Sequence, residues 1–555
     1  MEKGNDVVSK QGVTMSPPRV IIAGGGPVGL FLAADLGWRH VPTLVVERNA
    51  APTEQAKVMQ INIGTMELCR RLGIAESVEH WGFAPDYPMH NMFVTSLDGY
   101  ELSRSWSPPV GQPGSQGVTE FSPQYQIHCP QPWLEPAIER CARSFPSVEM
   151  RRQWEFDSFA ETTDSVLVTL RDCQNDEKVV VEADYLVGCE GFGGRVVRQL
   201  QIPVEERTVD YSVDLEFLTD DLFREHDKGP AIRYVFIGPR GTWGTLVAVD
   251  GRTRWRLSIY ALDPDDADTV DVHQAIERAI GHPFKYTLLR QGRWRRRVAL
   301  AASFGRGRVF IAGDEAHCTT PNGGFGMNTG IADAVNLAWK LEAALQGWAG
   351  PELLTSYGLE RRPVAQITLA ESVRNYHRIM GESAYEDIAG SSPEAETTRR
   401  QVGDQLAAAD RLAHWPIGIH IGYGYWWSPV VSGNPGEIGD FDPHAYRPSN
   451  VAGFRAPHTW LPDGRSTLDL FGRDHVLLNI GAEAGAGGEL LKAAQAAGIP
   501  VTVEHLNPAD AGNVYERSLL LVRPDGFIAW SGDDDPADPD SVVNCIRGAT
   551  VAAAV

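Results

Sequence analysis

Residues 19–47 read RVIIAGGGPVGLFLAADLGWRHVPTLVVE, and they carry the clearest structural signal in the chain. Arg19 to Ala23 form a short apolar, mostly β-branched run, which is typical of a buried parallel strand. The run stops at the glycines of residues 24–29, and Leu30 to Trp38 then predict a helix. A second strand is expected at Thr43 to Val46. This order predicts a βαβ unit that opens an α/β domain.

The glycines between the first strand and the helix follow the pattern Gly-x-Gly-x-x-Gly at residues 24, 26 and 29. Glycine permits a tight turn there and lets the backbone approach a pyrophosphate, which rests on the N–H groups of the helix N-terminus. Glu47 ends the second strand, where an acid can accept hydrogen bonds from a ribose hydroxyl. The unit therefore predicts dinucleotide binding, without telling FAD from NAD. Its candidate residues are Gly24, Gly26, Pro27, Gly29, Glu47 and Arg48.

Composition excludes several classes of protein. Of 555 residues, 50 are Lys or Arg and 72 are Asp or Glu, so the formal net charge is −22. This acidic balance argues against binding to nucleic acids or anionic membranes. The seven cysteines are scattered without Cys-x-x-Cys or metal-ligand spacing, so we expect a reducing compartment and no metal site. The chain has no apolar run of about 18 residues. We therefore expect a cytoplasmic protein.

A second glycine-rich segment follows the predicted strand Arg308 to Ala312. Residues 313–330 read GDEAHCTTPNGGFGMNTG and lead into a helix expected at Met327 to Leu345. An aspartate at a strand end can accept hydrogen bonds from the polyol chain of a flavin, and a loop entering a helix N-terminus offers N–H groups to a developing anion. This segment favours a flavin, and hence FAD. Its candidate residues are Gly313, Asp314, Pro321, Gly324, Gly326, Met327 and Asn328.

With both glycine-rich segments, the chain resembles the single-component FAD-dependent aromatic hydroxylases of the para-hydroxybenzoate hydroxylase fold, in the phenol hydroxylase-like branch. The resemblance runs from about Arg19 to Thr550. It implies bound FAD, with NADPH or NADH as a transient co-substrate, and O2. The implied reaction is hydroxylation of a phenolic substrate through a flavin C4a-hydroperoxide.

The resemblance also implies roles for single residues. The first glycine motif and Glu47 would hold the ADP half of FAD, and Asp314 and Gln131 would lie at its ribityl chain. Pro321, Gly324 and Asn328 would flank the flavin ring and serve oxygen activation. Lys57 and Gln60 fall where the family often has residues beside the flavin, and their roles stay open.

The family's middle motif is only partly present. Residues 188–198 read GCEGFGGRVVR, with Glu190 where Asp is usual, Gly194 where Ser is common and Val197 where Arg is common. Arg195 or Arg198 could replace the missing guanidinium.

The resemblance and the strand patterns together predict the domains. We expect a flexible tail at 1–18, then an FAD-binding Rossmann-like domain at 19–420, composed of segments of about 19–80, 125–200 and 298–420. Segments of about 81–124 and 201–297 would form an inserted antiparallel β-sheet substrate domain. A linker at 421–455 would lead to a thioredoxin-like α/β domain at 456–555. That domain lacks Cys-x-x-Cys, so packing or dimerisation, giving a homodimer, is its expected role.

Substrate contacts are expected from the antiparallel sheet. Arg233 is a candidate partner for a phenolate or carboxylate, and a further set of side chains could form an aromatic wall; each could equally be ordinary core or surface. That set comprises Tyr211, Tyr234, Phe236, Trp243 and Trp255. His317 is expected to be structural. The run Arg293 to Arg297 could attract a nicotinamide-cofactor phosphate, although a solvated strand face is the simpler interpretation.

Three other functions stay open at this point. One is a flavoprotein monooxygenase acting on a larger polyketide-like aromatic. Another is an NAD(P)-dependent dehydrogenase, which should have a positioned acid–base group and no Gly313-Asp314 segment. The third is a non-catalytic adaptor with a degenerate nucleotide-binding fold.

Overall fold

The structure is a computed structural model. It describes residues 17–55, 57, 59–81, 84, 86–105, 120–220, 222–224, 226–380, 385–433, 440–483 and 485–549. The flexible tail expected at residues 1–18 lies outside the described residues, except for its last two positions.

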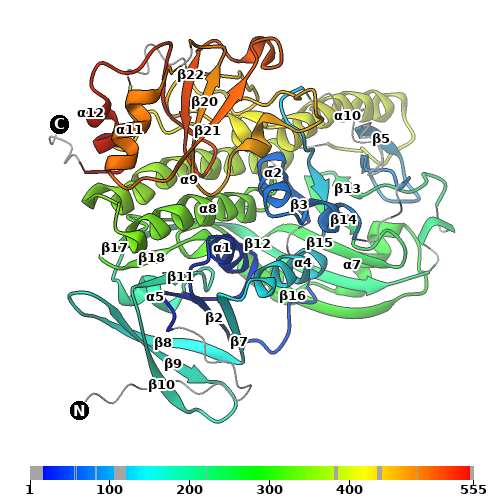
Figure 1. Ribbon diagram of the computed structural model, residues 1–555. Helices are drawn as coiled ribbons and strands as arrows, with labels where there is room; N and C mark the ends of the chain where they lie inside the picture. The colour runs from blue at the N-terminus through cyan, green and yellow to red at the C-terminus, as the bar shows by residue number, and fades with distance from the viewer. Residues whose placement is uncertain are drawn as a thin grey trace.

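A six-stranded sheet in the order β17-β18-β11-β1-β2-β7 forms the first layer (Figure 1). All neighbouring strands pair in parallel except β17 and β18, which pair antiparallel. Every residue of β1, β11 and β18 is buried, and this burial explains why their sequences are continuously apolar. The strands expected near residues 19–23 and 43–46 are confirmed. The bounds are β1 (Val20–Ala23), β2 (Thr43–Glu47), β7 (Val148–Arg152), β11 (Tyr185–Gly188), β17 (Gly305–Arg306) and β18 (Val309–Ile311).

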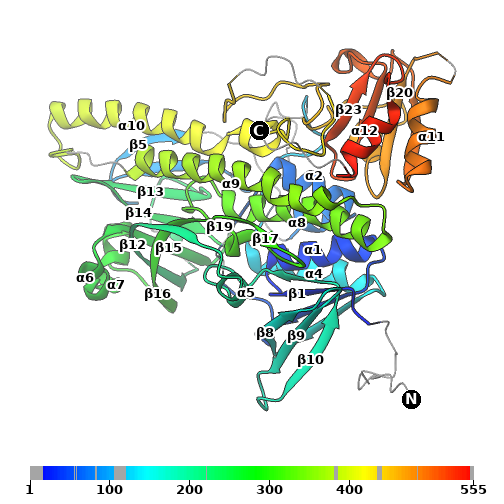
Figure 2. The ribbon, with the colours of Figure 1, turned by 90° about the vertical axis from the view of Figure 1, so that its left-hand side faces the viewer.

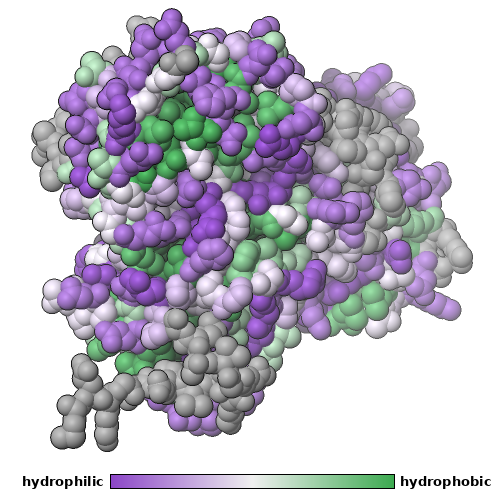
Figure 3. Space-filling view, viewed as in Figure 1, coloured by the Kyte–Doolittle hydropathy of each residue, from purple (hydrophilic) through white to green (hydrophobic). Residues whose placement is uncertain are grey.

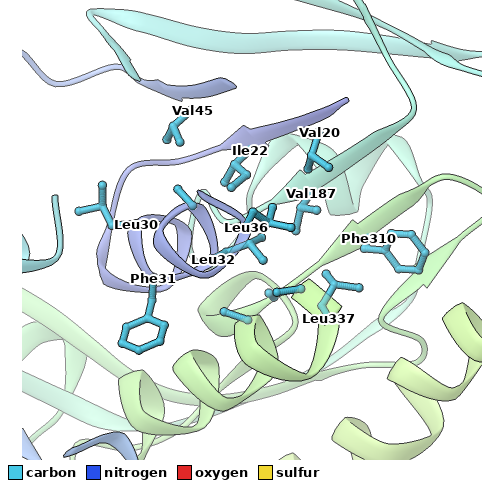
Figure 4. Packing of buried hydrophobic residues seen from close by; sticks show 14 of the residues in the cluster. Val20, Ile22, Leu30, Phe31, Leu32, Leu36, Val45, Val187, Phe310 and Leu337 are labelled. Atoms are coloured by element: carbon cyan, nitrogen blue, oxygen red, sulfur yellow. The ribbon is translucent and has the colours of Figure 1, made fainter. Parts of the chain in front are cut away.

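Helix α1 (Pro27–Trp38) packs between this sheet and two other helices, α4 (Gln131–Ser144) and α8 (Phe325–Gln346). Leu30, Leu32 and Leu36 of α1 lie among side chains from the strands and from α8 (Figure 4). All three leucines are fully buried. The first glycine-rich turn is therefore fixed at the edge of the largest hydrophobic core.

A second, eight-stranded sheet has the order β19-β16-β12-β15-β14-β13-β4-β5. Its neighbours pair antiparallel, except for β4 and β13. Helices α6 (Pro264–Thr269) and α7 (Val272–Ile280) pack on one face. The expected inserted antiparallel sheet is thus present. Its strands are β4 (Asn91–Val94), β5 (Glu101–Ser105), β12 (Val204–Leu218), β13 (Arg233–Gly238), β14 (Gly241–Ala248), β15 (Arg254–Leu262), β16 (Thr287–Ala301) and β19 (His317–Cys318).

Three smaller features complete this part of the chain. A three-stranded antiparallel arm projects from the first sheet and is seen at the bottom of Figure 2; it contains β8 (Trp154–Glu161), β9 (Val166–Asp172) and β10 (Lys178–Ala183). A two-stranded ladder joins β3 (Gln60–Ile61) to β6 (Ile127–His128). Short helices are α2 (Ile63–Arg71), α3 (Ala75–Glu79) and α5 (Arg195–Gln199).

The long helical region after residue 325 consists of three helices, α8, α9 (Pro351–Met380) and α10 (Pro393–His414). α8 ends at Gly347, which adopts φ +85°. This left-handed conformation favours glycine and stops the helix. α10 begins after Ser392, whose side chain accepts a hydrogen bond from the Ala395 N–H. Both residues are standard helix caps, one at a helix end and one at a helix start.

The C-terminal unit (residues 475–546) has its own sheet, in the order β21-β20-β22-β23, and lies above α8 and α9 in Figure 1. β20 and β21 pair in parallel and the other neighbours antiparallel, as in the expected thioredoxin-like fold. Its elements are β20 (His475–Ile480), α11 (Gly488–Ala496), β21 (Val501–Leu506), β22 (Leu519–Val522), β23 (Ile528–Gly532) and α12 (Pro539–Ile546).

Hydrophobic side chains on the face shown in Figure 3 occur in small groups among hydrophilic ones. None of the helices in the described part of the chain is long and apolar enough to cross a membrane.

Candidate active site

The turn between β1 and α1 is closed by glycines. Gly24 has φ +112°, and a Cβ there would lie 2.3 Å from the Cys189 carbonyl oxygen. A Cβ at Gly29 would lie 2.0 Å from the Gly24 carbonyl oxygen, whereas a Cβ at Gly26 would meet no atom within 4 Å. Gly24 and Gly29 are therefore required for close packing, and Gly26 faces open space. α1 begins at Pro27 without a side-chain cap, so its N-terminal N–H groups face this space.

Glu47 lies at the end of β2 beside that turn. One of its carboxylate oxygens accepts the Gly25 N–H at 2.8 Å, and the other accepts the Asn49 N–H at 2.8 Å. Glu47 thus connects the β2 end to the glycine turn, and the adjacent Arg48 is exposed. This is the position at which a ribose would meet the acid in a βαβ unit.

Asp314 lies where β18 ends, in the turn Gly313–Glu315. Gly313 adopts φ +63°. Asp314 is exposed, and partial loss of hydration next to the protein raises the pKa of its carboxyl. The charges of His317 and Lys57 act against that rise. Among the described residues none donates a hydrogen bond to this carboxyl, so it is available to hydroxyl groups of a ligand.

The second glycine-rich loop leads directly into α8. Gly323 and Gly324 adopt φ +100° and +66°, and Gly324 precedes the helix without a side-chain cap. A Cβ at Gly330 would lie 2.8 Å from the Cα of Gly313, so the loop and the Asp314 turn pack closely. Pro321 is exposed and accepts the Gly324 N–H through its carbonyl at 3.0 Å. The two glycine-rich turns and Asp314 thus border the same edge of the first sheet.

Asn328 and Met327 are held inside the protein. The Asn328 amide donates to the carbonyls of Gln60 at 3.0 Å and Gly324 at 2.6 Å, and its oxygen accepts the Asn62 N–H at 3.0 Å. Asn328 therefore joins β3 to the loop, and its hydrogen-bonding capacity is used within the chain. Met327 belongs to the largest hydrophobic core. The role in oxygen activation expected for Asn328 stays a prediction.

Gln131 begins α4 and carries an unsatisfied acceptor. Its amide nitrogen donates to Glu135 at 2.6 Å, while its amide oxygen is buried without a hydrogen-bond partner. Burial raises the pKa of Glu135, which also accepts the Thr53 N–H. A buried acceptor without a donor is costly, and a ligand hydroxyl would satisfy it. The glycine turns, Asp314 and Gln131 thus fit the chemical groups of FAD.

The middle motif forms the loop between β11 and α5. Glu190 accepts the N–H groups of Arg195 at 2.7 Å and Val196 at 3.3 Å. The Arg195 guanidinium binds Glu155 in the arm, and Arg198 donates to the Gly194 carbonyl. Both arginines are therefore engaged away from the glycine turns, so the idea that one of them replaces the missing guanidinium gains no support.

His317 is part of a buried network. It contacts the Asp333 carboxylate at 2.7 Å, and the Arg361 guanidinium donates to the same carboxylate at 2.7 Å. Burial alone would raise the pKa of Asp333, but the charges of His317 and Arg361 hold it below its usual value. Because Asp333 also accepts the Gly313 N–H, this network supports the turn that carries Asp314. The structural role expected for His317 agrees with these contacts.

The side chains expected to form an aromatic wall lie mostly in a hydrophobic core of the second sheet. The side chains of Tyr234, Phe236 and Trp255 belong to the core that includes α6 and α7. Trp243 stacks on Phe236 and lies under the Arg278 guanidinium. Tyr211 lies under the guanidinium of Arg293. Side chains alternate along a strand, so Tyr234, Phe236 and Trp255 face away from the Arg233 side of the sheet, and their role in substrate binding stays a prediction.

Arg233 occupies the opposite face. It shares one cross-strand row with Val247 and Arg256. Val247 packs against Met59, which precedes β3, so this row faces the β3–β6 ladder. Burial lowers the pKa of Arg233; Asp410 acts against this and Arg256 adds to it. The row therefore brings two guanidinium groups to the side of the sheet that faces the flavin-loop region.

A relay of hydrogen bonds positions Arg233. Its Nη1 lies 2.7 Å from Nε2 of His414, and because Arg only donates, that imidazole nitrogen accepts. The other ring nitrogen, Nδ1, lies 3.0 Å from the Asp410 carboxylate. Asn91 donates to both oxygens of Asp410. Arg233 is thus held in place by the imidazole of His414 on α10.

The β3–β6 ladder places His128 and Gln60 at the candidate site, and neither residue has a role assigned from the sequence. Burial, followed by the charges of Arg233 and Arg256, lowers the pKa of His128 to about 3. Gln60 donates to the Gln126 side chain at 2.9 Å, and its Cβ would lie 3.1 Å from a Cβ at Gly324. Strands of two residues show no hydrophobic periodicity, so the sequence does not predict this ladder. Gln60 is noted from the sequence only because its position matches one beside the flavin in the family.

The arginine run on β16 is neutralised locally. Arg293 pairs with Asp268, Arg295 and Arg297 with Glu206, and Arg296 with Asp210. This pairing agrees with a strand face rather than a phosphate site.

A cavity of about 110 Å³ lies between α2, α8, α9 and the C-terminal unit. A cavity of about 150 Å³ holds a benzene molecule, so this one is too small for a multi-ring substrate.

Comparison with known proteins identifies the family. The FAD binding domain family matches residues 18–372, and the C-terminal domain of aromatic-ring hydroxylases matches residues 449–549. A putative polyketide hydroxylase of Streptomyces halstedii is 31% identical, covering 96% of each chain. The 2,4-dichlorophenol 6-monooxygenase of Delftia acidovorans is 30% identical, covering 92% of this chain and 94% of the relative.

A solved structure agrees in fold over nearly the whole chain. It is RebC soaked with chromopyrrolic acid, with bound 7-carboxy-K252c. It is 34% identical, covers 96% of this chain and 100% of that one, and superimposes with a TM-score of 0.89.

Proposed function

The chain belongs to the FAD-dependent aromatic-ring hydroxylases, and from this premise we propose that its substrate is an aromatic compound carrying an anionic group. As a member of this family it is a monooxygenase that uses FAD, with O2 and NAD(P)H as general co-substrates. The reduced cofactor supplies the oxygen chemistry, and the protein orients the substrate and excludes water.

We assign the FAD site to the two glycine-rich turns. The Gly24 turn and the start of α1 would hold the pyrophosphate, with Glu47 at the ribose. Asp314 and the unsatisfied oxygen of Gln131 would accept hydrogen bonds from the ribityl hydroxyls. The loop from Pro321 to α8 would present N–H groups to the flavin ring. The assignment is supported by acceptors that have no donor among the described residues, and by Gly24 and Gly29, which leave no room for Cβ atoms.

The charge on the substrate is inferred from Arg233 and Arg256. Two guanidinium groups in one cross-strand row repel each other, and burial strengthens that repulsion. Among the described residues, Asp410 is the carboxylate whose charge acts on Arg233, and it is already bound by Asn91 and His414. A carboxylate or phenolate on the substrate would stabilise the buried guanidinium of Arg233. This cationic row is the observation that carries the proposal.

Both ring sizes considered from the sequence are represented among relatives. The Delftia relative is named for a dichlorophenol, the Streptomyces relative for a polyketide, and the RebC ligand is named as a carboxy compound. An anionic group is common to a phenolate, an acidic polyketide and a carboxylate. We therefore propose that a negative charge on the substrate is what the site recognises, and the experiment below distinguishes one ring from several.

Four compounds test the proposal: a one-ring and a multi-ring aromatic, each as the carboxylate and as its neutral amide. Binding to the holoenzyme is followed by the change in flavin absorbance, and turnover by NADH and NADPH oxidation. We expect the acid of one ring size to bind at least tenfold more tightly than its amide, because a charge-assisted hydrogen bond contributes about 1.5–3 kcal/mol. Arg233→Met should abolish this preference, whereas Arg240→Met, at an exposed turn, should retain it. Equal binding of acid and amide by the wild-type enzyme would contradict the proposal.

A cytoplasmic location and a homodimer belong to the same proposal. The composition supports the first, and the second follows from the role expected for the C-terminal unit. Fractionation of the native host and analytical ultracentrifugation of the holoenzyme are the respective tests.

A further inference from the structure

The carboxyl group of Glu315 fills a slot between two glycines. A Cβ at Gly194 would lie 2.3 Å from Glu315 Oε1, and a Cβ at Gly188 would lie 2.7 Å from its Oε2. Real Cβ contacts are never this short, so the slot exists only because both positions lack side chains. Glu315 itself is 3% exposed.

Helix α5 starts beside this slot without a cap of its own. Its N-cap residue is Gly194, which has no side chain to accept hydrogen bonds. Glu190 accepts the N–H groups of the first two helical residues, Arg195 and Val196. Glu315 Oε1 accepts the third, that of Val197, at 2.9 Å. The first three N–H groups of the helix are thus satisfied by two glutamates.

The bond to the third N–H is the one that an N-cap side chain normally makes. Ser, Thr, Asp or Asn at the N-cap accepts from the second or third helical N–H. Here the acceptor comes from a residue 118 positions away from Val197. We propose that Glu315 replaces residue 194 as the N-cap of α5 and, through this bond, is a positioning residue for the FAD site.

The connection to the FAD site is direct on both sides of Glu315. Its Oε2 accepts the Glu190 N–H at 2.9 Å. The Gly24 turn packs on this same peptide, since a Cβ at Gly24 would lie 2.9 Å from the Glu190 nitrogen. In sequence, Glu315 directly follows Asp314. One side chain therefore links the pyrophosphate turn to the aspartate that faces the ribityl chain.

The ionised form of Glu315 is the one that accepts two hydrogen bonds. Burial raises the pKa of Glu315 to about 8, and the repulsion of Glu190 adds to this; the two N–H donors and Arg198 lower it. Tests are therefore made at pH 9, where the carboxylate is ionised.

The decisive experiment is a double-mutant cycle of Glu315→Ala and Gly194→Ser. FAD affinity is measured by dilution of the holoenzyme with flavin fluorescence, and the thermal midpoint is recorded alongside. Each single variant should weaken FAD binding about tenfold, which corresponds to the loss of one N-cap bond of about 1.4 kcal/mol. Glu315→Ala removes the acceptor of the Val197 N–H, and the Cβ added by Gly194→Ser displaces the Glu315 carboxyl from it. The double variant should return to within about threefold of wild type, since the serine then has room and can accept the Val197 N–H itself.

Two further variants sharpen the result. Glu315→Gln keeps the shape but replaces one acceptor oxygen by a donor, so it should weaken FAD binding less than Glu315→Ala does. Gly292→Ser is the matched control, because a Cβ at Gly292 meets no atom within 4 Å, and it should not change FAD binding.

If the losses of FAD affinity in the two single variants add up in the double variant, the Glu315 side chain does not act as the N-cap in place of a side chain at position 194. A Glu315→Ala enzyme with a lower thermal midpoint but unchanged FAD affinity would overturn the positioning role. Should Glu315→Ala not fold, Glu315→Ser, which also empties the slot, is compared with and without Gly194→Ser by the same criterion.

Discussion

Arg523 of the C-terminal unit and Glu360 of α9 form a two-bond ion pair in the interior of the protein. Nη1 lies 2.6 Å from Oε1 and Nη2 lies 2.9 Å from Oε2. Lys340 on α8 donates to the same carboxylate at 2.7 Å, and both Arg523 and Glu360 are at most 1% exposed. Burial alone would raise the pKa of Glu360, but these cations hold it well below its usual value. The C-terminal unit is therefore joined to α8 and α9 through charges that must stay paired.

Arg523→Ala should lower the free energy of unfolding by about 3–5 kcal/mol, because it leaves carboxylates buried without their guanidinium partner. Chemical denaturation of the holoenzyme measures this loss. Arg517→Ala, which breaks an exposed pair with Asp533, should change the unfolding midpoint very little. Equal effects of the two substitutions would show that the interface does not depend on the buried pair.

Asp314→Ala should reduce FAD occupancy of the purified enzyme. Loss of an acceptor for ligand hydroxyls costs about 1–3 kcal/mol, which corresponds to about a five- to hundredfold weaker affinity. The ratio of flavin to protein absorbance measures occupancy, and Asp164→Ala, at an exposed turn, serves as the control. Full flavin retention by Asp314→Ala would count against its assignment to the ribityl chain.

His475→Phe should make the enzyme more resistant to acid. His475 is fully buried against Trp339 and Trp348, and burial lowers its pKa to about 3. In the unfolded chain the pKa is about 6.5. The unfolded state therefore binds the proton first, and stability present above about pH 6.5 is lost as the pH falls toward 3, by up to about 1.4 kcal/mol per pH unit.

Urea unfolding midpoints between pH 4 and 7.5 test this expectation. The slope of stability against pH should be smaller for His475→Phe than for wild type. His505→Phe, at an exposed position of β21, should leave the slope unchanged. A wild-type slope in His475→Phe would mean that this imidazole is not neutral in the folded state.

Cys545→Ser should leave turnover and FAD content within about twofold of wild type. The thiol lies on α12, where it contacts the Pro429 carbonyl at 3.3 Å, and burial raises its pKa. It is thus a protonated donor that a serine hydroxyl can replace. A large loss of turnover in a normally folded variant would reveal a function of the C-terminal unit that involves this thiol.

Local patterns in the sequence predicted the parts of the fold that depend on neighbouring residues. The apolar run at β1, the glycines at 24–29 and the helix after them predicted the βαβ unit, because strand, turn and helix propensities act within a few residues. Asp314 and its loop were found for the same reason. Their contacts in the structure agree with those expectations, although their roles toward FAD stay predictions.

Tertiary structure alone decided which face of the sheet each residue of β13 occupies and which residue caps α5. Alternation along a strand separates Arg233 from Tyr234, but it does not tell which of them faces the core, and pairing across strands fixes the choice. Similarly, no local pattern connects Gly194 to Glu315, because the carboxyl fills the missing side chain only after β11 and β18 pair. The sequence determines contacts that lie within a turn or a strand, whereas those between distant segments depend on packing and register, which form only in the folded chain.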